Sequence, residues 1–536
     1  MAIITLGALF SNLNDWPGHL LQNQDGTFVI TTQTANTFSY LIGAGDSHFP
    51  NYRVTVTGSG LQYDADGAIG GTMGAVRIYD PAGTLILTFD RLAANTLASD
   101  FSQFYQNVFG SALNGDGPGP DATAAWSHLM SGNDVINGTA GNDWQGFLGI
   151  DAGNDRYNMG LGDDFIYGGS GNDTMNGGDG YDVLSYGRTT WSEGQAAFKG
   201  IIVNMNTGVL QDAWGGRDVI SNFEEVQGSR FNDTFFGSDT QRDRFQGGRG
   251  RDTIDGGANS YDATGTIRTE DRRDQVNYDN DYWNGGRRGI IVDLETNADP
   301  ASIRGTIRDG FGNIDTVIDI ERVVGTRFND VFVGSRMNNA FSGGEGVDSF
   351  DGMAGFDFLD FGRNFTGGAQ VGAIVDLRRA TGQIRNDGFG NVENALNIEQ
   401  LNGSDFSDRF IGNAQENWLE GANGADTMTG GGGRDYFFWY DQNQFNEGDS
   451  VTDFAATGPD ADFLSFDTGS FTGMTTTAVV VNGTAATQAG VGTFVFNAIN
   501  DTLYWDQDGA GGAQAQTIAV LANVASLSAA NFDLFD

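Results

Sequence analysis

The segment GLGDDFIYGGSGNDTMNGGDGYDVLSYG, residues 160–187, repeats a Gly-x-Asp pattern every nine residues. Its aspartates are Asp164, Asp173 and Asp182, and each is followed two positions later by an apolar residue. Glycine permits the restricted backbone angles of tight turns, and the residues from each aspartate onward can form a short strand. The pattern therefore predicts stacked short strands that are joined by glycine turns and share a narrow apolar core.

The nine-residue spacing returns in four series, two of which keep strict nines. The series are Asp134, Asp143, Asp155, Asp164, Asp173 and Asp182; Asp233, Asp243 and Asp252; Asp330, Asn339, Asp348 and Asp357; and Asp408, Asn417, Asp426 and Asp435. A longer repeat of about eighty to ninety residues begins at GIIVNM (200–205), GIIVDL (289–294) and GAIVDL (372–377). These three segments alternate like strands, and the connectors RDGFGN and RNDGFGN are rich in turn residues.

Stacked turns would place the aspartates in columns at the strand spacing of about 4.8 Å, where bare carboxylates repel one another. A hard divalent cation takes about six to eight oxygen ligands, and carboxylates together with glycine carbonyls can supply them. Calcium fits such turns better than magnesium, which demands strict octahedral geometry. The repeats therefore predict several bound Ca²⁺ ions.

The composition excludes some partners and some kinds of site. The chain has 70 acidic and 28 basic residues, a net charge of -42 and no cysteine. Such charge repels nucleic acid and anionic lipid, and disulfides and thiolate metal sites are excluded. The N-terminus has no basic residue before Arg53, and no apolar run approaches the roughly 20 residues of a membrane helix. We expect no nucleic-acid binding, no membrane insertion and no classical signal peptide.

Sequence signatures of catalysis are missing. The three histidines form no HExxH motif, and neither GxSxG nor a phosphate-binding GxxxxGK[ST] occurs. Carboxylate-only chemistry, as in glycoside hydrolysis, stays open because acids are abundant. We therefore expect no enzymatic activity, with a polysaccharide-acting enzyme as the less favoured alternative.

The segments GLGDDFIYG, GGSGNDTMN, GGDGYDVLS and GGRGRDTID resemble the GGxGxDxUx repeats of the RTX (haemolysin-type calcium-binding) family, over about residues 130–455. The resemblance implies a parallel β-roll with calcium between its turns. It also implies that the sixth-position aspartates bind calcium, namely Asp134, Asp143, Asp155, Asp164, Asp173, Asp182, Asp243, Asp252, Asp348, Asp357, Asp426 and Asp435. Asn339 and Asn417 depart from the pattern, and the turns at Asp233 and Asp408 lack its glycines, so these two turns are interpreted as caps.

The C-terminal segment IAVLANVASLSAANFDLF is similar to the tails of RTX proteins exported by type I secretion. This resemblance implies the type I secretion machinery as a partner and an extracellular or cell-surface location in a Gram-negative bacterium.

The predicted fold is all-β: a parallel β-roll array between a β-rich N-terminal domain, with a helix at 92–109, and a β-rich C-terminal region. Strands are expected at YRVTVTG, AVRIYD and TLILTF, and later at YFFWY, DSVTDF and DFLSFD. The expected divisions are 1–127, the N-terminal domain; 128–199, the first RTX block; 200–288, a second unit with an insertion; 289–371 and 372–455, a third and a fourth unit; and 456–536, the C-terminal cap and secretion signal.

Two functions fit this organisation. The favoured hypothesis is a calcium-binding structural protein that self-associates into a surface layer, extracellular matrix or filament. The alternative is an adhesin whose N-terminal domain binds a protein or a cell-surface polysaccharide. The arginines around 242–273 could form ion pairs on an acidic face or contact a neighbouring subunit.

Overall fold

The computed structural model describes two compact units, residues 1–272 and 273–536, which we call the N-terminal and C-terminal units. The described residues are 3–6, 29–34, 37–42, 52–64, 67–79, 85–90, 135–137, 142, 152–187, 197–239, 241–257, 273–297, 302–362 and 371–535. Strands dominate them, and the helical elements are the 3-10 turns η3 (Asp279–Asp281), η4 (Gln442–Gln444), η5 (Thr468–Ser470) and η6 (Ala529–Asn531). Among these residues, no helix has the length and apolar character needed to cross a bilayer.

The N-terminal unit begins with an antiparallel sheet, which confirms the strands predicted at YRVTVTG, AVRIYD and TLILTF. Its strands pair in the order β2 (Val29–Thr34), β3 (Thr37–Ile42), β4 (Tyr52–Asp64), β5 (Gly67–Tyr79), β6 (Leu85–Asp90) and β1 (Ile3–Leu6). The predicted helix at 92–109 lies outside the described residues. Strand β1 also pairs in parallel with β7 (Val135–Asn137), the first strand of the repeats.

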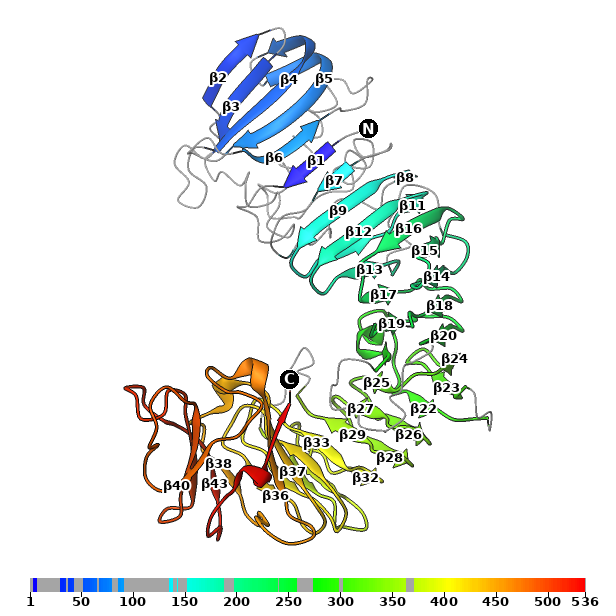
Figure 1. The fold of residues 1–536 in the computed structure, drawn as a ribbon. Helices are drawn as coiled ribbons and strands as arrows, with labels where there is room; N and C mark the ends of the chain where they lie inside the picture. The colour runs from blue at the N-terminus through cyan, green and yellow to red at the C-terminus, as the bar shows by residue number, and fades with distance from the viewer. Residues whose placement is uncertain are drawn as a thin grey trace. The chain divides into compact units, whose positions relative to one another are not determined.

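Short parallel strands then stack into a roll, as predicted (Figure 1). Ile166 aligns with Leu184 and Tyr157 with Met175, so one coil takes eighteen residues, or two nonapeptides. One ladder contains β9 (Arg156–Leu161), β12 (Thr174–Asp179) and β16 (Arg217–Ser221), then β14 (Ile202–Asn204), β18 (Thr234–Phe236) and β20 (Thr253–Asp255). The other contains β10 (Phe165–Tyr167), β13 (Val183–Ser185), β17 (Glu225–Gln227) and β19 (Arg244–Gln246), and the pair β8 (Ala152–Gly153) and β11 (Ser170–Gly171) lies in the turns.

The C-terminal unit continues the same architecture. One ladder is β21 (Gln275–Asn277), β25 (Arg322–Val324), β27 (Ala340–Ser342), β29 (Phe358–Asp360), β33 (Gln400–Asn402), β35 (Trp418–Glu420), β37 (Tyr436–Trp439), β39 (Phe463–Asp467) and β44 (Phe532–Phe535). The opposite side contains β22 (Ile291–Asp293), β26 (Val331–Ser335), β28 (Ser349–Met353) and β32 (Asn394–Leu396), then β30 (Ile374–Asp376), β34 (Arg409–Ile411), β36 (Thr427–Thr429), β38 (Asp449–Val451) and β43 (Gln516–Leu521).

Each long repeat inserts an antiparallel hairpin between two nonapeptide blocks. In the first, β14 pairs with β15 (Val209–Gln211), and β15 pairs with β16, which joins the preceding block. The second uses β22, β23 (Arg304–Arg308) and β24 (Ile314–Ile318), and the third uses β30 and β31 (Ile384–Asn386). The IVDL-like segments therefore form strands, as predicted, and each begins the ladder of the block that follows.

The core is built around the apolar residue that lies two positions after the aspartate or asparagine of each nonapeptide. Ile166, Leu184, Phe245, Phe341 and Phe410 are fully buried. Phenylalanines stack along the roll, and the ring centroids of Phe332 and Phe350 lie 4.9 Å apart. The repeated apolar position therefore supplies a continuous part of the core between the two ladders.

The C-terminal segment closes the roll. Strand β43 extends one ladder and pairs with β42 (Thr502–Asp506), which pairs with β41 (Thr493–Asn497) and then β40 (Val480–Asn482), while β44 extends the other ladder. Ile518, Leu521 and Phe532 are buried there. The residues that resemble a secretion tail therefore cover the end of the core in the folded protein.

We expect Phe341→Ala to lower the free energy of unfolding by about 3–5 kcal/mol, because it leaves a cavity in the stack. The ring centroids of Phe341 and Phe332 lie 5.3 Å apart. Urea unfolding at saturating calcium measures the loss. The control is Phe406→Ala, where the side chain is 38% exposed and a loss of about 1 kcal/mol or less is expected. Equal losses for the two variants would contradict the assigned core.

Candidate calcium-binding turns

The sixth-position aspartates lie immediately before the strands, and their carboxylates stack into two columns. Each backbone N–H donates to an Oδ1 atom one coil later, from Asp155 to Asp173 at 2.7 Å and from Asp164 to Asp182 at 2.8 Å. In the C-terminal unit, Asp408 donates in the same way to Asp426 at 2.7 Å. One oxygen of each carboxylate therefore holds neighbouring coils in register.

The second carboxylate oxygen has no such role in the glycine-rich turns. The Oδ2 atom is buried and has no hydrogen-bond partner among the described residues in Asp173, Asp182, Asp348, Asp357 and Asp426. These side chains are at most 3% exposed. A buried anionic oxygen without a partner is costly, so it points to a ligand that the protein itself does not provide.

The first glycine of GGxGxD makes room for this oxygen. A Cβ atom on Gly343 would lie 2.3 Å from Asp348 Oδ2, and one on Gly421 would lie 2.3 Å from Asp426 Oδ2. The fourth position needs glycine for another reason, because Gly346 has a φ of 129°. The turn sequence thus leaves space and backbone freedom around an unpartnered carboxylate oxygen.

Burial and mutual repulsion disfavour the ionised carboxylates in the absence of a cation. Burial, with repulsion from Asp218, raises the pKa of Asp173 to about 8. Burial raises the pKa of Asp357 to about 8 and that of Asp426 to about 9, with Glu399 and Asp449 adding repulsion. A bound divalent cation reverses this preference by stabilising the charged form.

A second type of turn satisfies its carboxylate with hydrogen bonds from its own residues. In G[ST]xFxD, Asp330 Oδ2 accepts the Thr326 backbone N–H at 2.7 Å, and its Oδ1 accepts the Thr326 hydroxyl at 3.0 Å. Ser404 serves Asp408 in the same way, and Ser229 serves Asp233. This geometry supports the interpretation of the Asp233 and Asp408 turns as caps.

Three further turns differ from the glycine-rich ones. Asp243 was predicted to bind calcium, but its Oδ2 accepts the Ser238 backbone N–H, as in the serine turns. The amide oxygens of Asn339 and Asn417 accept backbone N–H groups of Ser335 and Asn413. An amide oxygen, or a carboxylate oxygen that already accepts a hydrogen bond, is a weaker cation ligand than an unpartnered carboxylate oxygen.

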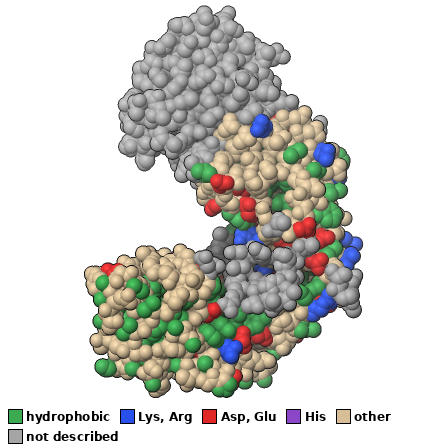
Figure 2. Space-filling view, viewed as in Figure 1, with side chains coloured by type: hydrophobic (Ala, Val, Ile, Leu, Met, Phe, Trp, Pro, Cys, Tyr) green, Lys and Arg blue, Asp and Glu red, His purple; other side chains and the backbone are tan. Residues whose placement is uncertain are grey.

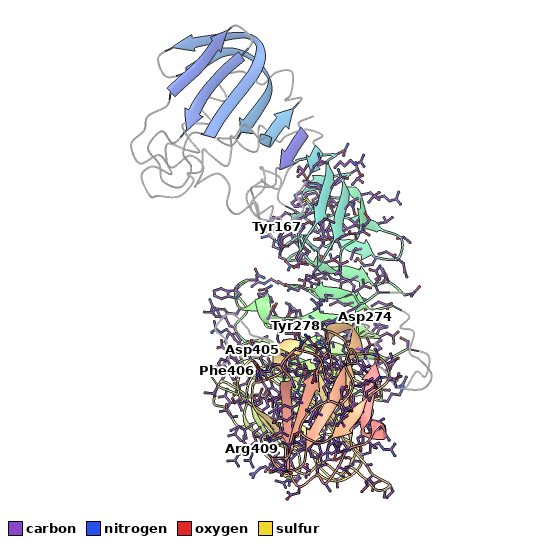
Figure 3. The ribbon with its side chains drawn as sticks, turned by 60° about the vertical axis from the view of Figure 1, so that its left-hand side comes forward. Tyr167, Asp274, Tyr278, Asp405, Phe406 and Arg409 are labelled. Carbon is purple, nitrogen blue, oxygen red and sulfur yellow. The ribbon has the colours of Figure 1, made fainter. Side chains whose placement is uncertain are left out.

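The structure places the remaining predicted ligands as follows. Asp155, Asp164, Asp173, Asp182, Asp252, Asp348, Asp357, Asp426 and Asp435 are all buried in the turns. Asp134 and Asp143 lie outside the described residues. Outside the predicted set, Asp274 immediately precedes β21 and donates its backbone N–H to Glu321, and the buried Tyr278 immediately follows the same strand (Figure 3).

No group of three or more acidic, histidine or cysteine side chains in the described ranges is arranged to hold a metal ion. A cation in these turns would therefore take one or two carboxylates and complete its shell with backbone carbonyls, which are ligands that calcium accepts. The residues fit that ion, and the aspartates with unpartnered Oδ2 atoms would hold it. Its chemistry there is charge neutralisation, which couples binding to folding.

Sequence reasoning missed acids outside the nonapeptides. The backbone N–H of Asp182 donates to Glu224 at 2.7 Å, and that of Asp357 donates to Glu399 at 2.9 Å. Glu224 lies in FEEVQGSRFND and Glu399 in IEQLNGSDFSD, each shortly before a cap turn, so the signal was present in the sequence.

A family model of the RTX calcium-binding nonapeptide repeat matches residues 130–144, 150–184, 238–260, 324–359 and 402–437. These segments contain the glycine-rich turns and all twelve predicted ligands. No curated protein matches the chain.

We expect Asp357→Asn to lower calcium binding, because it removes a carboxylate with an unpartnered oxygen. Equilibrium dialysis should show one fewer bound ion per chain, or one ion held at least about tenfold more weakly. The control is Asp330→Asn, which disturbs a turn satisfied by Thr326 and should reduce stability without changing the calcium count. An unchanged count for Asp357→Asn would remove it from the ligand set.

The calcium-free protein should lose stability as pH rises. Carboxyls whose folded pKa is raised, to about 8 in Asp173 and about 9 in Asp426, stabilise the fold fully below their unfolded pKa of 3.8, and this contribution disappears as pH rises through 8 to 9. Circular dichroism of protein desalted free of calcium should show a larger folded fraction at pH 5 than at pH 8.5. With calcium the trend should reverse, because binding requires deprotonated carboxylates. A calcium-free folded fraction that rises with pH would refute the burial of ionisable carboxyls.

Proposed function

Because the chain carries the calcium-binding nonapeptide repeats of the RTX family, we propose that it is a secreted structural protein that folds and assembles on external calcium. It would be a subunit of a bacterial surface layer, extracellular matrix or filament. The observation that carries the proposal is the set of buried Oδ2 atoms without a hydrogen-bond partner in the described turns. The proposal assigns no catalytic role to the chain.

Calcium dependence supplies a physical reason for folding outside the cell. With a net charge of -42 and columns of buried carboxylates, the roll is disfavoured where calcium is scarce. An unfolded chain could pass through the type I secretion machinery and fold on meeting external calcium, since binding free energy becomes folding free energy. The C-terminal segment would act first as the export signal and afterwards as the cap formed by β43 and β44.

Exposed apolar side chains on the roll support self-association. The first residue of the leading strand in each long repeat is an exposed isoleucine: Ile202, Ile291 and Ile374 are 46, 44 and 36% exposed. Val331 pairs with Ile291 in the neighbouring strand and is 40% exposed. Hydrophobic side chains also lie among polar ones on the surface shown in Figure 2. Exposed apolar groups at equivalent positions of successive repeats can be buried between subunits.

One observation favours an adhesin as the second candidate, with its contact in the repeats and not in the N-terminal domain. Trp283 is 65% exposed, and its ring contacts Tyr282, over which Arg327 stacks at 4.4 Å. An exposed aromatic ring that is held in place by neighbouring side chains can stack on a sugar ring. Loss of binding to a cell-surface polysaccharide in Trp283→Ala, with assembly unchanged, would support the adhesin.

Sedimentation velocity on calcium-free protein, repeated with millimolar calcium, tests the proposed function. We expect an expanded monomer to become large regular assemblies, because calcium folds the roll and creates its apolar faces. Replacement of Ile202, Ile291 and Ile374 by Thr should reduce assembly while leaving the folded monomer intact. A compact monomer at every protein concentration would overturn the structural role while keeping the calcium-dependent fold.

A further inference from the structure

Each long repeat contains three acids at strict six-residue intervals outside the nonapeptides. The triplets are Asp212, Asp218 and Glu224; Asp309, Asp315 and Glu321; and Asp387, Glu393 and Glu399. They follow the pattern D-x5-[DE]-x5-E and lie between an IVDL-like strand and the next G[ST]xFxD turn. Seven of the nine side chains are buried, and Glu224 and Glu399 are half-buried.

The first acid of the triplet fixes the hairpin turn. Asp387 Oδ1 accepts the backbone N–H groups of Phe389 and Asn391 at 2.9 Å, and its Oδ2 accepts the Asn391 side-chain amide at 2.7 Å. Asp212 likewise accepts backbone N–H groups from Trp214 and Gly216. This acid is therefore a positioning residue, since both oxygens of Asp387 already have partners.

The second and third acids end the two aspartate columns of the preceding block. Glu393 accepts the backbone N–H of Asp348 at 2.8 Å, and Glu399 accepts that of Asp357 at 2.9 Å. In the first long repeat, the corresponding pairs are Asp218 with Asp173 at 2.9 Å and Glu224 with Asp182 at 2.7 Å. Within a block this position belongs to the Oδ1 atom of the aspartate one coil later, as with Asp164 and Asp182. The triplet therefore supplies the accepting carboxylate at the end of each of these columns, where no further nonapeptide follows.

The aspartates at these ends are among those whose second carboxylate oxygen lacks a hydrogen-bond partner. Asp173, Asp182, Asp348 and Asp357 all have a buried Oδ2 atom with no hydrogen bond to any described residue. Asp348, which is 3% exposed, also lines a cavity of about 20 Å³ together with Glu393, Asp387, Gly343 and Gly344. A space of that size holds one small ion or one water molecule.

A hydrogen-bonding cap alone does not explain the choice of acids. Glutamine or asparagine would accept the same N–H without the cost of burying a second negative charge beside the first. The structure instead places a carboxylate at the end of both columns. Two carboxylates per end, with glycine backbone beside them, form an oxygen-rich setting for a hard cation.

We propose that the D-x5-[DE]-x5-E triplet completes the last calcium site of the nonapeptide columns that precede it. The second and third acids supply the carboxylate that a further repeat would have supplied, so that Glu393 acts with Asp348 and Glu399 acts with Asp357. Each site has two carboxylates and completes its shell with backbone carbonyls. This assignment rests on calcium binding by the repeats and is independent of assembly.

The test is a calcium count on Glu393→Gln and Glu399→Gln by equilibrium dialysis of the full chain. Glutamine keeps the oxygen that accepts the N–H of Asp348 or Asp357 and removes only the charge. We expect each variant to bind one fewer ion per chain, or to hold one ion at least tenfold more weakly. The control is Glu416→Gln, which removes an exposed acid and should leave the count unchanged.

Two further measurements keep the result decisive. If Glu393→Gln and Glu399→Gln match the control while Glu393→Ala loses only stability, the triplet is a hydrogen-bonding cap and the proposal is wrong. If a glutamine variant does not reach the wild-type circular dichroism at saturating calcium, the count on Asp218→Asn in the first long repeat decides in its place. All counts are made on dilute monomer, so a failure of assembly would not affect them.

Discussion

The structure depends on a conflict between strand stacking and charge. Parallel coils align the aspartates of successive repeats, and each carboxylate uses one oxygen to bind the backbone of the coil before it, as Asp426 does with Asp408. That hydrogen bond fixes the register but buries the negative charge. The roll is therefore a fold whose backbone pairing creates an electrostatic cost that an oxygen-seeking cation removes.

Two turn sequences resolve the conflict in different ways. G[ST]xFxD turns satisfy the carboxylate internally, because the Thr326 hydroxyl and backbone N–H both bind Asp330. GGxGxD turns place glycine beside the carboxylate, so Asp348 Oδ2 lies in space that a Cβ on Gly343 would occupy. The order of the two turn types along the chain thus sets which coils leave a buried carboxylate oxygen without a partner and which satisfy it internally.

The hairpins between blocks do more than connect ladders. They bring acids such as Glu393 and Glu399 to the ends of the aspartate columns, where no further nonapeptide follows. At the C-terminal end, Asp449 and Asp462 take the same position, accepting the backbone N–H groups of Asp426 and Asp435. Every block therefore ends on a carboxylate, whichever segment of the chain supplies it.

The sequence by itself determined the repeat, the apolar core and the need for a cation, because all three follow from one local pattern of nine residues. The ligand set was only partly predictable. Asp243 has the right spacing, yet Ser238 already satisfies it, and this depends on how the turn closes. Glu393 lies 45 residues from the Asp348 that it contacts, so only the hairpin topology brings the two together. Spacing identifies contacts within a coil, whereas tertiary structure decides those that cross from one block to the next.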